Sequence, residues 1–307
     1  MLIVFPSAYG MCFGVKDALT KVNTLAAPGQ ATIWGELVHN PDVNSQLRER
    51  GFQLQSESGR DIPATPDVVV TAHGISNRQR QRLEEAGKTV HDTTCPLVRK
   101  VHRMAMHLHN RGYHIVVVGK PGHVEVEGLI GDLEHYTVVP GPAQARTIPT
   151  EKLAVLAQTT TPPFLFQETV ARLKELHPDC EVKVVDTVCQ PTRDRQEAME
   201  QLIPRVDTVV VVGGRKSNNT LRLCELARQQ GKRCYHVERA EELENRWFEG
   251  ARVVGLTAGT STPDDMIKQV YRRLLSFARG LRQAVTQRQA LQIFPTRHLA
   301  NRQLAAT

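Results

Sequence analysis

The chain has 307 residues, 40% of them hydrophobic, and its 39 basic and 32 acidic residues give a net charge of +7. This length exceeds what one ordinary hydrophobic core needs and indicates two or three domains. No run of about 18 apolar residues is present, which excludes a membrane-spanning helix. The first residues also lack the charged start of a signal peptide. We therefore expect a cytoplasmic protein.

The positive charge is concentrated at the C-terminal end. Eight Lys and Arg residues and no acidic residue follow Asp265, so the first 265 residues carry a net charge of −1. Such a distribution is typical of a solubilising helix and tail. We therefore expect no nucleic acid and no membrane among the partners. Attraction of an anionic substrate or an acidic protein by the helix stays open.

Short Val- and Ile-rich runs alternate with helical patterns along the chain. Strands are predicted at 3–5, 31–34, 68–71, 115–118, 153–157, 182–186, 209–212 and 253–257. Helices are predicted at 15–26, 45–50, 76–86, 96–111, 163–177, 193–203 and 220–230. This alternation predicts an α/β protein with mainly parallel sheets. Ligands of such sheets bind beyond the carboxyl ends of the strands.

Three cysteines stand at matching places in three copies of one unit: Cys12, Cys95 and Cys189. A polar loop follows each after 27 or 28 residues, at His39, His123 and Ser217. A second polar loop closes each unit and contains His73, Thr159 and Ser261. Repeats stack around an axis where equivalent positions meet. We expect three pseudo-repeat domains at 1–94, 95–188 and 189–280, a basic tail at 281–307, and convergence of the three thiols.

Three converging thiolates suit zinc or an iron–sulfur cluster. A structural zinc site normally has CxxC pairs and four protein ligands, which this chain lacks. A cubane cluster held by three cysteines would leave one iron open to substrate, so we favour the cluster and keep zinc as the alternative. Cys12 and Cys95 also stand where helices begin, which we expect to lower their thiol pKa. The other cysteines are expected to be packing residues without disulfides: Cys180, Cys224 and Cys234.

The polar loops offer many hydrogen-bond donors, which suit phosphate oxygens. The candidates are His39, His73, His123, Thr159, Ser217, Asn218, Asn219 and Ser261. No GxxxxGK[ST] or GxGxxG motif follows a strand, so a small phosphorylated molecule is favoured over a nucleotide. Glu125 or Glu127 is expected to supply a proton, and their spacing does not choose between them.

Eight ordered motifs between Met1 and Ala278 resemble those of the LytB family of 4-hydroxy-3-methylbut-2-enyl diphosphate reductases. They are GMCFGV at 10–15, ELVHN at 36–40, AHGIS at 72–76, TCPLV at 94–98, GHVEVEG at 122–128, QTT at 158–160, SNN at 217–219 and TAGTSTPD at 257–264. Five residues beside these motifs differ from those usual in the family: Tyr9, Phe13, Lys120, Val124 and Asp194.

The resemblance implies a trefoil of three α/β domains around a central [4Fe–4S] cluster, ligated by Cys12, Cys95 and Cys189 with one open iron. It implies that the diphosphate of an allylic substrate is held by His39, His73, His123, Ser217, Asn219 and Ser261. Glu125 would be the proton source and Thr159 would lie near the substrate hydroxyl. No flavin or nicotinamide motif is present, so an external electron donor such as ferredoxin or flavodoxin is implied.

Two other functions remain alternatives to this reductase. One is a zinc-dependent hydrolase of a phosphorylated metabolite, and the other is a non-enzymatic iron–sulfur sensor. A sensor has no use for converging phosphate-binding loops, which counts against it.

Overall fold

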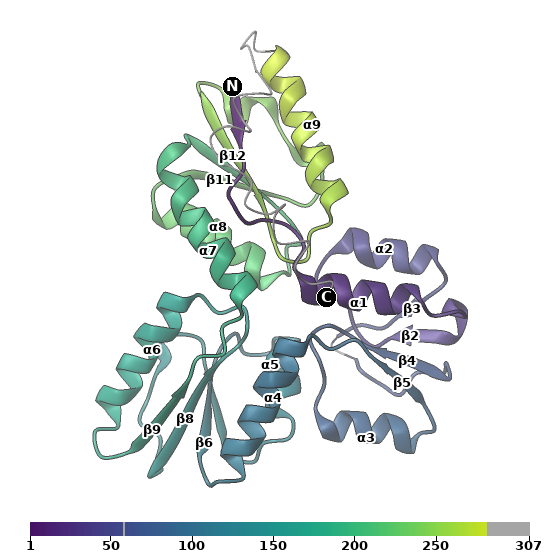
Figure 1. Ribbon diagram of the computed structural model, residues 1–307, viewed down its shortest axis with the longest axis vertical. Coiled ribbons are helices and arrows are strands. Elements are labelled where there is room, and N and C mark those ends of the chain that lie inside the picture. Colours follow the sequence, from purple (N-terminus) through teal and green to yellow (C-terminus); the bar gives the residue numbers. More distant parts are fainter. Residues whose placement is uncertain (58, 281–307) are drawn as a thin grey trace, which may run out of the picture. The chain divides into compact units, whose positions relative to one another are not determined.

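The computed structural model describes residues 1–57 and 59–280 and contains three four-stranded parallel sheets (Figure 1). Two of the sheets belong to a compact unit of residues 12–193, here called the two-domain unit. The third belongs to the one-domain unit, which comprises residues 1–11 and 194–280. The predicted tail at 281–307 lies outside the described residues. The three parallel α/β domains are confirmed, whereas their arrangement as a trefoil stays a prediction.

The first domain has the strand order β3-β2-β4-β5. Its elements are α1 (Phe13–Asn23), β2 (Ala31–Ile33), α2 (Pro41–Glu49), β3 (Gln53–Leu54), β4 (Asp67–Val70), α3 (Asn77–Glu85) and β5 (Thr89–Asp92). The second domain has the order β7-β6-β8-β9. Its elements are α4 (Pro96–His109), β6 (His114–Val118), α5 (Val124–Ile130), β7 (Tyr136–Val139), β8 (Lys152–Ala157), α6 (Pro163–Leu176) and β9 (Glu181–Val185).

The third domain has the order β1-β12-β10-β11. Its elements are β10 (Thr208–Val212), α8 (Asn218–Gln229), β11 (Arg233–Val237), β12 (Val253–Ala258), α9 (Asp264–Gly280) and β1 (Leu2–Val4). Helix α7 (Gln190–Leu202) begins in the two-domain unit and continues into this domain. All five residues of β10 are buried, as expected for a central parallel strand with helices on both faces. The continuous Val run of this strand therefore follows directly from its place in the sheet.

The N-terminal strand differs from the predicted division of the chain. Residues 1–94 were expected to form one domain, but β1 pairs with β12 in the third sheet. It takes the edge place that β5 and β9 occupy in the other two sheets. No strand follows β12 within residues 259–280, so β1 takes this edge place beside β12. The apolar Ile3 of β1 is only 1% exposed there. Each of the three key cysteines thus follows an edge strand of one sheet and begins the helix that leads into the next.

Contacts at the ends of α3 and α5 join the first domain to the second within the two-domain unit. The Asp132 carboxylate accepts hydrogen bonds from the backbone N–H groups of Asn77 and Arg78, at 2.6 and 3.0 Å. A Cβ atom on Gly128 would lie only 3.3 Å from the Gly74 carbonyl oxygen, so α5 packs directly against the loop that carries His73. These contacts fix the C-terminal half of α5 beside the first domain.

Within residues 1–57 and 59–280, no helix combines the length and apolar character that a membrane crossing needs.

Candidate functional site

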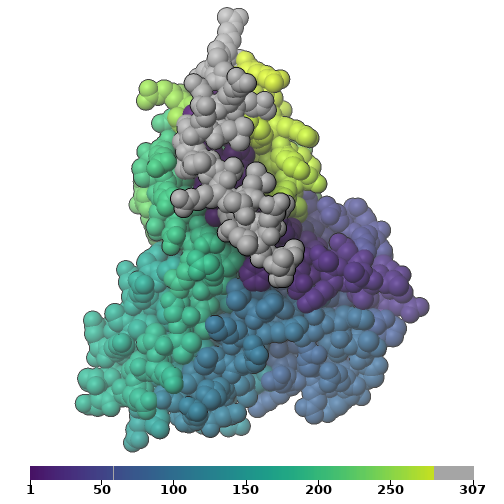
Figure 2. Space-filling view, viewed as in Figure 1, coloured from purple at the N-terminus to yellow at the C-terminus, as the bar shows by residue number. Residues whose placement is uncertain are grey.

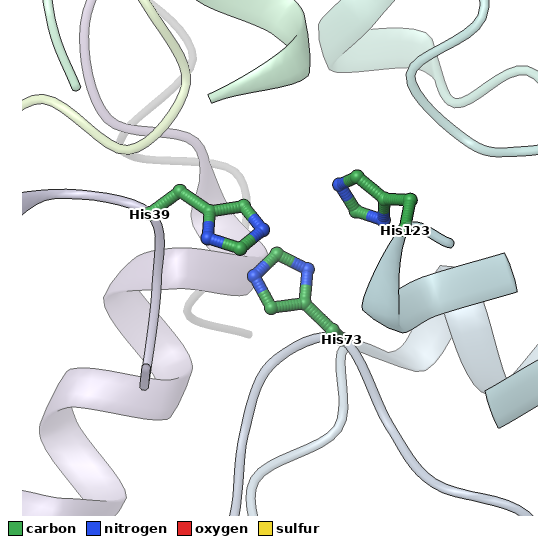
Figure 3. A group of neighbouring side chains, drawn as sticks. All are labelled: His39, His73 and His123. Carbon is green, nitrogen blue, oxygen red and sulfur yellow. The ribbon is translucent and has the colours of Figure 1, made fainter. Parts of the chain in front are cut away.

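Three histidines from separate loops of the two-domain unit point toward one another (Figure 3). We call His39, His73 and His123 the histidine cluster. Each has a ring nitrogen within 4.8 Å of the others, and the rings of His39 and His73 are stacked at 4.4 Å between centroids. His39 and His123 are 6% and 8% exposed, and His73 is partly buried. The sequence prediction that these three side chains converge is therefore met by the geometry.

The local backbone explains how each imidazole is held. His39 directly precedes Asn40, whose side chain caps α2 by accepting from two backbone N–H groups. His73 is followed by Gly74 at a φ of +77°, where a Cβ atom would lie 2.9 Å from Thr94 Cγ2. Because side chains rarely adopt this backbone conformation, the tight turn after β4 depends on glycine. His123 itself caps α5.

The capping bond of His123 decides what its ring can bind. Nδ1 of His123 accepts a hydrogen bond from the Glu125 backbone N–H, at 3.1 Å. Nδ1 therefore carries no proton, and the neutral ring must carry it on Nε2. A protonated Nε2 donates to an anion and has no lone pair for a metal ion. The histidine cluster is thus built for an acceptor such as a phosphate oxygen rather than for zinc.

Burial keeps two of the three rings neutral. It lowers the pKa of His123 to about 3, with further lowering from His39 and Lys120. Burial also lowers the pKa of His73 well below its usual range, with smaller contributions from His39, His123 and Arg60. A neutral imidazole donates one hydrogen bond. The cluster therefore binds an anion through N–H donors rather than through positive charge.

Acidification should destabilise the two-domain unit through these rings. Between about pH 6.5 and 3, His123 binds a proton in the unfolded chain but not in the folded one, so the free energy of unfolding falls as pH falls. Urea unfolding should show that wild type loses about 2 kcal/mol more than His123→Gln between pH 7 and pH 5. The exposed-site variant His107→Gln should behave like wild type. Equal losses in wild type and His123→Gln would contradict the neutral state of this ring.

The three repeat-equivalent cysteines occupy equivalent places in the structure. Each lies immediately before a helix, and its carbonyl oxygen accepts the first helical hydrogen bond, from Lys16, Arg99 and Arg193, respectively. The carbonyl oxygens of Ala72 and Thr159, in the closing loops of the preceding units, accept from the backbone N–H groups of Cys95 and Cys189. The repeat in the sequence therefore corresponds to a repeat in hydrogen bonding.

The thiols of these cysteines are electrostatic neighbours. A charge on Cys12 would raise the pKa of both Cys95 and Cys189, and so would the charge of Glu125. The backbone at Gly14 approaches Cys95 so closely that a Cβ atom there would lie 2.5 Å from its Sγ. Glycine at this position therefore leaves room for the Cys95 thiol at the start of α1.

The predicted lowering of the thiol pKa by helix termini is wrong for Cys95. Burial raises its pKa, although the backbone N–H groups of Leu97 and Val98 at the start of α4 act in the opposite direction. Burial likewise raises the pKa of Cys189 to about 11, against a hydrogen bond with Thr192. Desolvation thus outweighs the helix terminus, and without a positive partner these side chains are neutral thiols.

A buried carboxylate connects the histidine cluster with the thiols. Glu125 is 5% exposed, and its two carboxylate oxygens accept from the backbone N–H and the hydroxyl of Thr159, at 2.7 and 3.0 Å. The Thr159 carbonyl oxygen in turn accepts from the Cys189 N–H at 2.9 Å. Burial raises the pKa of Glu125, while the two Thr159 hydrogen bonds lower it. The structure thus brings the predicted site residues Glu125, Thr159 and Cys189 together in one continuous network.

The structure also distinguishes Glu125 from Glu127. In an extended segment both side chains would lie on one side, but residues 124–130 form a helix. Two positions along a helix differ by about 200° in direction. Glu127 is consequently exposed, and it accepts from the Gly122 N–H at 3.2 Å. Only Glu125 faces the buried network.

Four predicted residues lie together in the one-domain unit: Ser217, Asn218, Asn219 and Ser261. Ser217 caps α8, and its hydroxyl accepts from the Thr220 N–H. A Cβ atom on Gly259 would lie 2.0 Å from Thr220 Oγ1, so the loop after β12 packs tightly against the start of α8. Among the residues that the structure describes, neither side-chain amide atom of Asn219 has a hydrogen-bond partner, although the residue is 1% exposed.

Charged residues that the sequence patterns did not single out surround the histidine cluster. His39 Nδ1 lies 3.4 Å from a carboxylate oxygen of Glu36 and 3.8 Å from one of Glu57. Arg60 acts electrostatically on His73. Glu57 and Arg60 belong to an irregular segment between β3 and β4, where no periodicity marks a functional side chain. Glu36 alone had a signal, because it belongs to a motif of the resemblance.

The five residues that differ from the family pattern have varied environments. Tyr9 and Phe13 are 41% and 52% exposed, and the Tyr9 ring packs on Phe5 at 5.0 Å. Lys120 is exposed and lowers the pKa of His123, whereas Val124 is buried. Asp194 is partly buried in α7.

Comparisons with known proteins identify the relatives of this chain. The family model described as LytB protein matches residues 3–275. A 4-hydroxy-3-methylbut-2-enyl diphosphate reductase of Methylibium petroleiphilum is 39% identical over 271 residues, which cover 86% of this chain and 82% of the relative. The protein of the same name from Aquifex aeolicus is 34% identical over 285 residues, which cover 91% of this chain and 97% of the relative.

Solved structures show the same fold. The E-1-hydroxy-2-methyl-but-2-enyl-4-diphosphate reductase of Plasmodium falciparum has a TM-score of 0.81 at 24% identity, covering 90% of this chain and 88% of that one. A second structure, of (E)-4-hydroxy-3-methyl-but-2-enyl diphosphate reductase, has a TM-score of 0.63 at 34% identity, covering 90% of this chain and 99% of that one. Because the LytB model spans most of the chain and full-length relatives exceed 30% identity, the chain belongs to the LytB family.

Proposed function

We propose that this chain is a 4-hydroxy-3-methylbut-2-enyl diphosphate reductase. It converts its substrate to isopentenyl and dimethylallyl diphosphate by two-electron reductive dehydroxylation, the last step of the methylerythritol phosphate route. The names of its relatives support this activity. The observation that carries it is the buried network from Glu125 through Thr159 to Cys189 beside a cluster of anion-binding imidazoles.

The three thiols fit an iron–sulfur cofactor. Cys12, Cys95 and Cys189 each begin a helix, and Gly14 leaves space at the Cys95 sulfur. We propose that these three residues hold a [4Fe–4S] cluster, which would supply the two electrons and one open coordination position. Burial raises the pKa of the free thiols of Cys95 and Cys189, and a bound metal would supply the positive charge that their thiolates need.

The polar side chains would hold the diphosphate end of the substrate. Nε2–H of His123 is available as a donor in the histidine cluster. We propose that the four polar residues of the one-domain unit complete the binding site: Ser217, Asn218, Asn219 and Ser261. The unpartnered amide of Asn219 supports this assignment, because a buried polar group without a partner normally awaits a ligand or water.

Proton delivery would fall to Glu125. A carboxyl group whose pKa is raised by burial retains its proton closer to neutral pH and is suited to general acid catalysis. Thr159 holds both of its oxygens and thereby fixes the direction from which the proton comes. The Thr159 hydroxyl also lies within the network, where the substrate hydroxyl is expected.

The zinc hydrolase is less well supported than the reductase. For a zinc site at the thiols, the chain lacks the CxxC pairs of structural zinc sites, and its relatives are named as reductases. The histidine cluster is no substitute for such a site, because the ring of His123 is held in the tautomer that donates from Nε2. An iron–sulfur sensor would leave the buried carboxylate and the converging donors unexplained. The cytoplasmic location stays a prediction.

We propose that the external electron donor, an acidic one-electron carrier of the ferredoxin or flavodoxin type, approaches beside Phe13. This side chain is 52% exposed and directly follows Cys12. The exposed Lys16 lies one turn further along α1 and has no ion-pair partner within the described part of the chain. The starts of α1 and α4 adjoin, since a Cβ atom on Gly14 would lie 2.5 Å from Cys95 Sγ, and purple and blue atoms lie side by side in Figure 2. Helix α4 adds the exposed Lys100 and Arg103. Exposed positive charge would attract such a carrier.

Replacing Phe13 should therefore slow turnover driven by ferredoxin but not turnover driven by a small chemical reductant. Phe13→Ala is expected to lower ferredoxin-driven turnover by about threefold to tenfold, because an aromatic contact at the interface is lost. Turnover driven by a small chemical reductant should stay within about twofold of wild type. The matched control Phe164→Ala removes a similarly exposed ring, 43% exposed, from α6 and should change neither. Equal slowing with both electron sources would place Phe13 outside the docking surface.

An anaerobic assay tests the proposed function. Protein purified without oxygen should contain iron and sulfide rather than zinc, and should consume the hydroxy-diphosphate only when a reductant is present. A colourless zinc protein that acts without reductant would favour the hydrolase.

A further inference from the structure

Arg60 carries two buried N–H groups that have no acceptor. Nε and Nη2 are both inaccessible to solvent and make no hydrogen bond with any residue in 1–57 or 59–280. The guanidinium lies over the Trp34 ring, with Cζ 5.4 Å from its centroid, and a Cβ atom on Gly35 would come within 3.1 Å of Nη2. Buried donors of a charged group are rarely left unsatisfied, because losing their hydration costs several kcal/mol. This side chain therefore points to a missing anionic partner.

The neighbours of Arg60 indicate that this missing partner lies near the histidine cluster. Its charge contributes to lowering the pKa of His73. Glu57, in the same loop, places its carboxylate 3.8 Å from His39 Nδ1 and interacts electrostatically with Arg60. The loop is anchored by Trp34, whose indole N–H donates to the Asp61 carbonyl oxygen at 3.0 Å. A Cβ atom on Gly35 would lie 3.1 Å from Arg60 Nη2 and 3.4 Å from Glu57 Cγ, so Arg60 lies beside the residue whose carboxylate neighbours the histidine cluster.

The particular atoms left unpaired indicate the shape of the partner. Nε–H and Nη2–H lie on one side of the planar guanidinium and point in parallel, which is the edge that takes two oxygens of a carboxylate or phosphate. Within the described part of the chain, Glu57 is the carboxylate whose charge acts on Arg60, and it makes no hydrogen bond to this edge. A tetrahedral phosphate bound to the imidazoles would present two such oxygens.

We propose that Arg60 is a further substrate-binding residue, whose Nε–H and Nη2–H donate to one phosphate of the diphosphate held by the histidine cluster. This inference rests on the proposed function for the identity of the substrate. A bound phosphate gives both N–H donors an acceptor, and the face of Trp34 keeps the guanidinium in place. Arg60 therefore contributes to affinity more than to the chemical step.

Inhibition and direct binding of inorganic diphosphate test this role. Arg60→Gln should raise both the KM for substrate and the Kd of diphosphate by about 10- to 100-fold, as expected for lost charge-assisted hydrogen bonds. Its kcat should remain within about threefold of wild type. Arg60→Lys should recover part of the affinity, because lysine keeps the charge but not the paired donors. Arg82→Gln, which removes an exposed arginine of α3, should leave all three constants unchanged.

The outcomes separate this inference from the proposed function. Calorimetry with inorganic diphosphate requires no turnover, so a wild type that binds diphosphate through Arg60 but lacks reductase activity would contradict only the proposed function. An active enzyme whose Arg60→Gln variant keeps wild-type KM and Kd would overturn only the role of Arg60. If Arg60→Gln fails to fold, Arg60→Lys decides: an unchanged Kd excludes paired hydrogen bonds from the guanidinium.

Discussion

Cys12→Ser, Cys95→Ser and Cys189→Ser should each lose the iron–sulfur cluster and the activity. Serine oxygen is a poor substitute for thiolate toward iron, and no other cysteine occupies an equivalent place in the three repeats. Iron and sulfide per chain, measured after anaerobic purification, should fall to a small fraction of wild type in all three variants. The loss should be similar for each, because the three positions have equivalent backbone environments.

The remaining cysteines provide controls for this experiment. Cys180→Ser and Cys234→Ser should keep the cluster, since both residues lie away from the helix starts that carry the thiols. Cys224 is 1% exposed within the core of the third domain, so Cys224→Ser should keep the cluster but lower stability. Wild-type iron and sulfide in Cys189→Ser would refute the proposed ligand set.

Glu125→Gln should keep the cluster and the substrate affinity but turn over about 10²- to 10⁴-fold more slowly, the usual contribution of a general acid. Glutamine preserves the shape and one acceptor toward Thr159 but has no acidic proton to deliver. Steady-state kinetics with a chemical reductant would show the loss in kcat rather than in KM. The matched variant Glu127→Gln alters an exposed side chain on the same helix and should be near normal. The opposite pattern would identify Glu127 as the proton donor.

The sequence predicted the interior of the fold better than its edges. All six central strands were predicted, because residues such as Val116 and Val210 are buried on both faces of a sheet and form continuous apolar runs. The four unpredicted strands, β3, β5, β7 and β11, all lie at sheet edges. Their exposed or partly exposed residues, among them Tyr136 and Arg233, interrupt the apolar pattern. The placement of β1 beside β12 is a long-range pairing that no local pattern records.

Functional residues were likewise predicted only where a sequence pattern marks them. The three cysteines and the three histidines follow strands at repeated spacings, so the sequence alone placed them on one functional edge. The choice of Glu125 required the short α5, whose seven residues are too few for a clear helical period. Arg60 had no signal at all, since its role depends on stacking over Trp34 and on a loop without regular structure. The thiol pKa was predicted from helix termini alone, while burial, which decides its direction, is visible only in the folded chain.

The fate of the substrate's hydroxyl oxygen tests the central claim most directly. Substrate labelled with ¹⁸O at the hydroxyl can be converted anaerobically in D₂O with a chemical reductant, and the products analysed by mass spectrometry. Reductive dehydroxylation consumes two electrons and two protons, so the label should appear in water. Isopentenyl and dimethylallyl diphosphate should each gain one deuterium and keep the diphosphate intact. Release of inorganic phosphate or diphosphate, with ¹⁸O retained in the organic product, would contradict the account and identify a hydrolase.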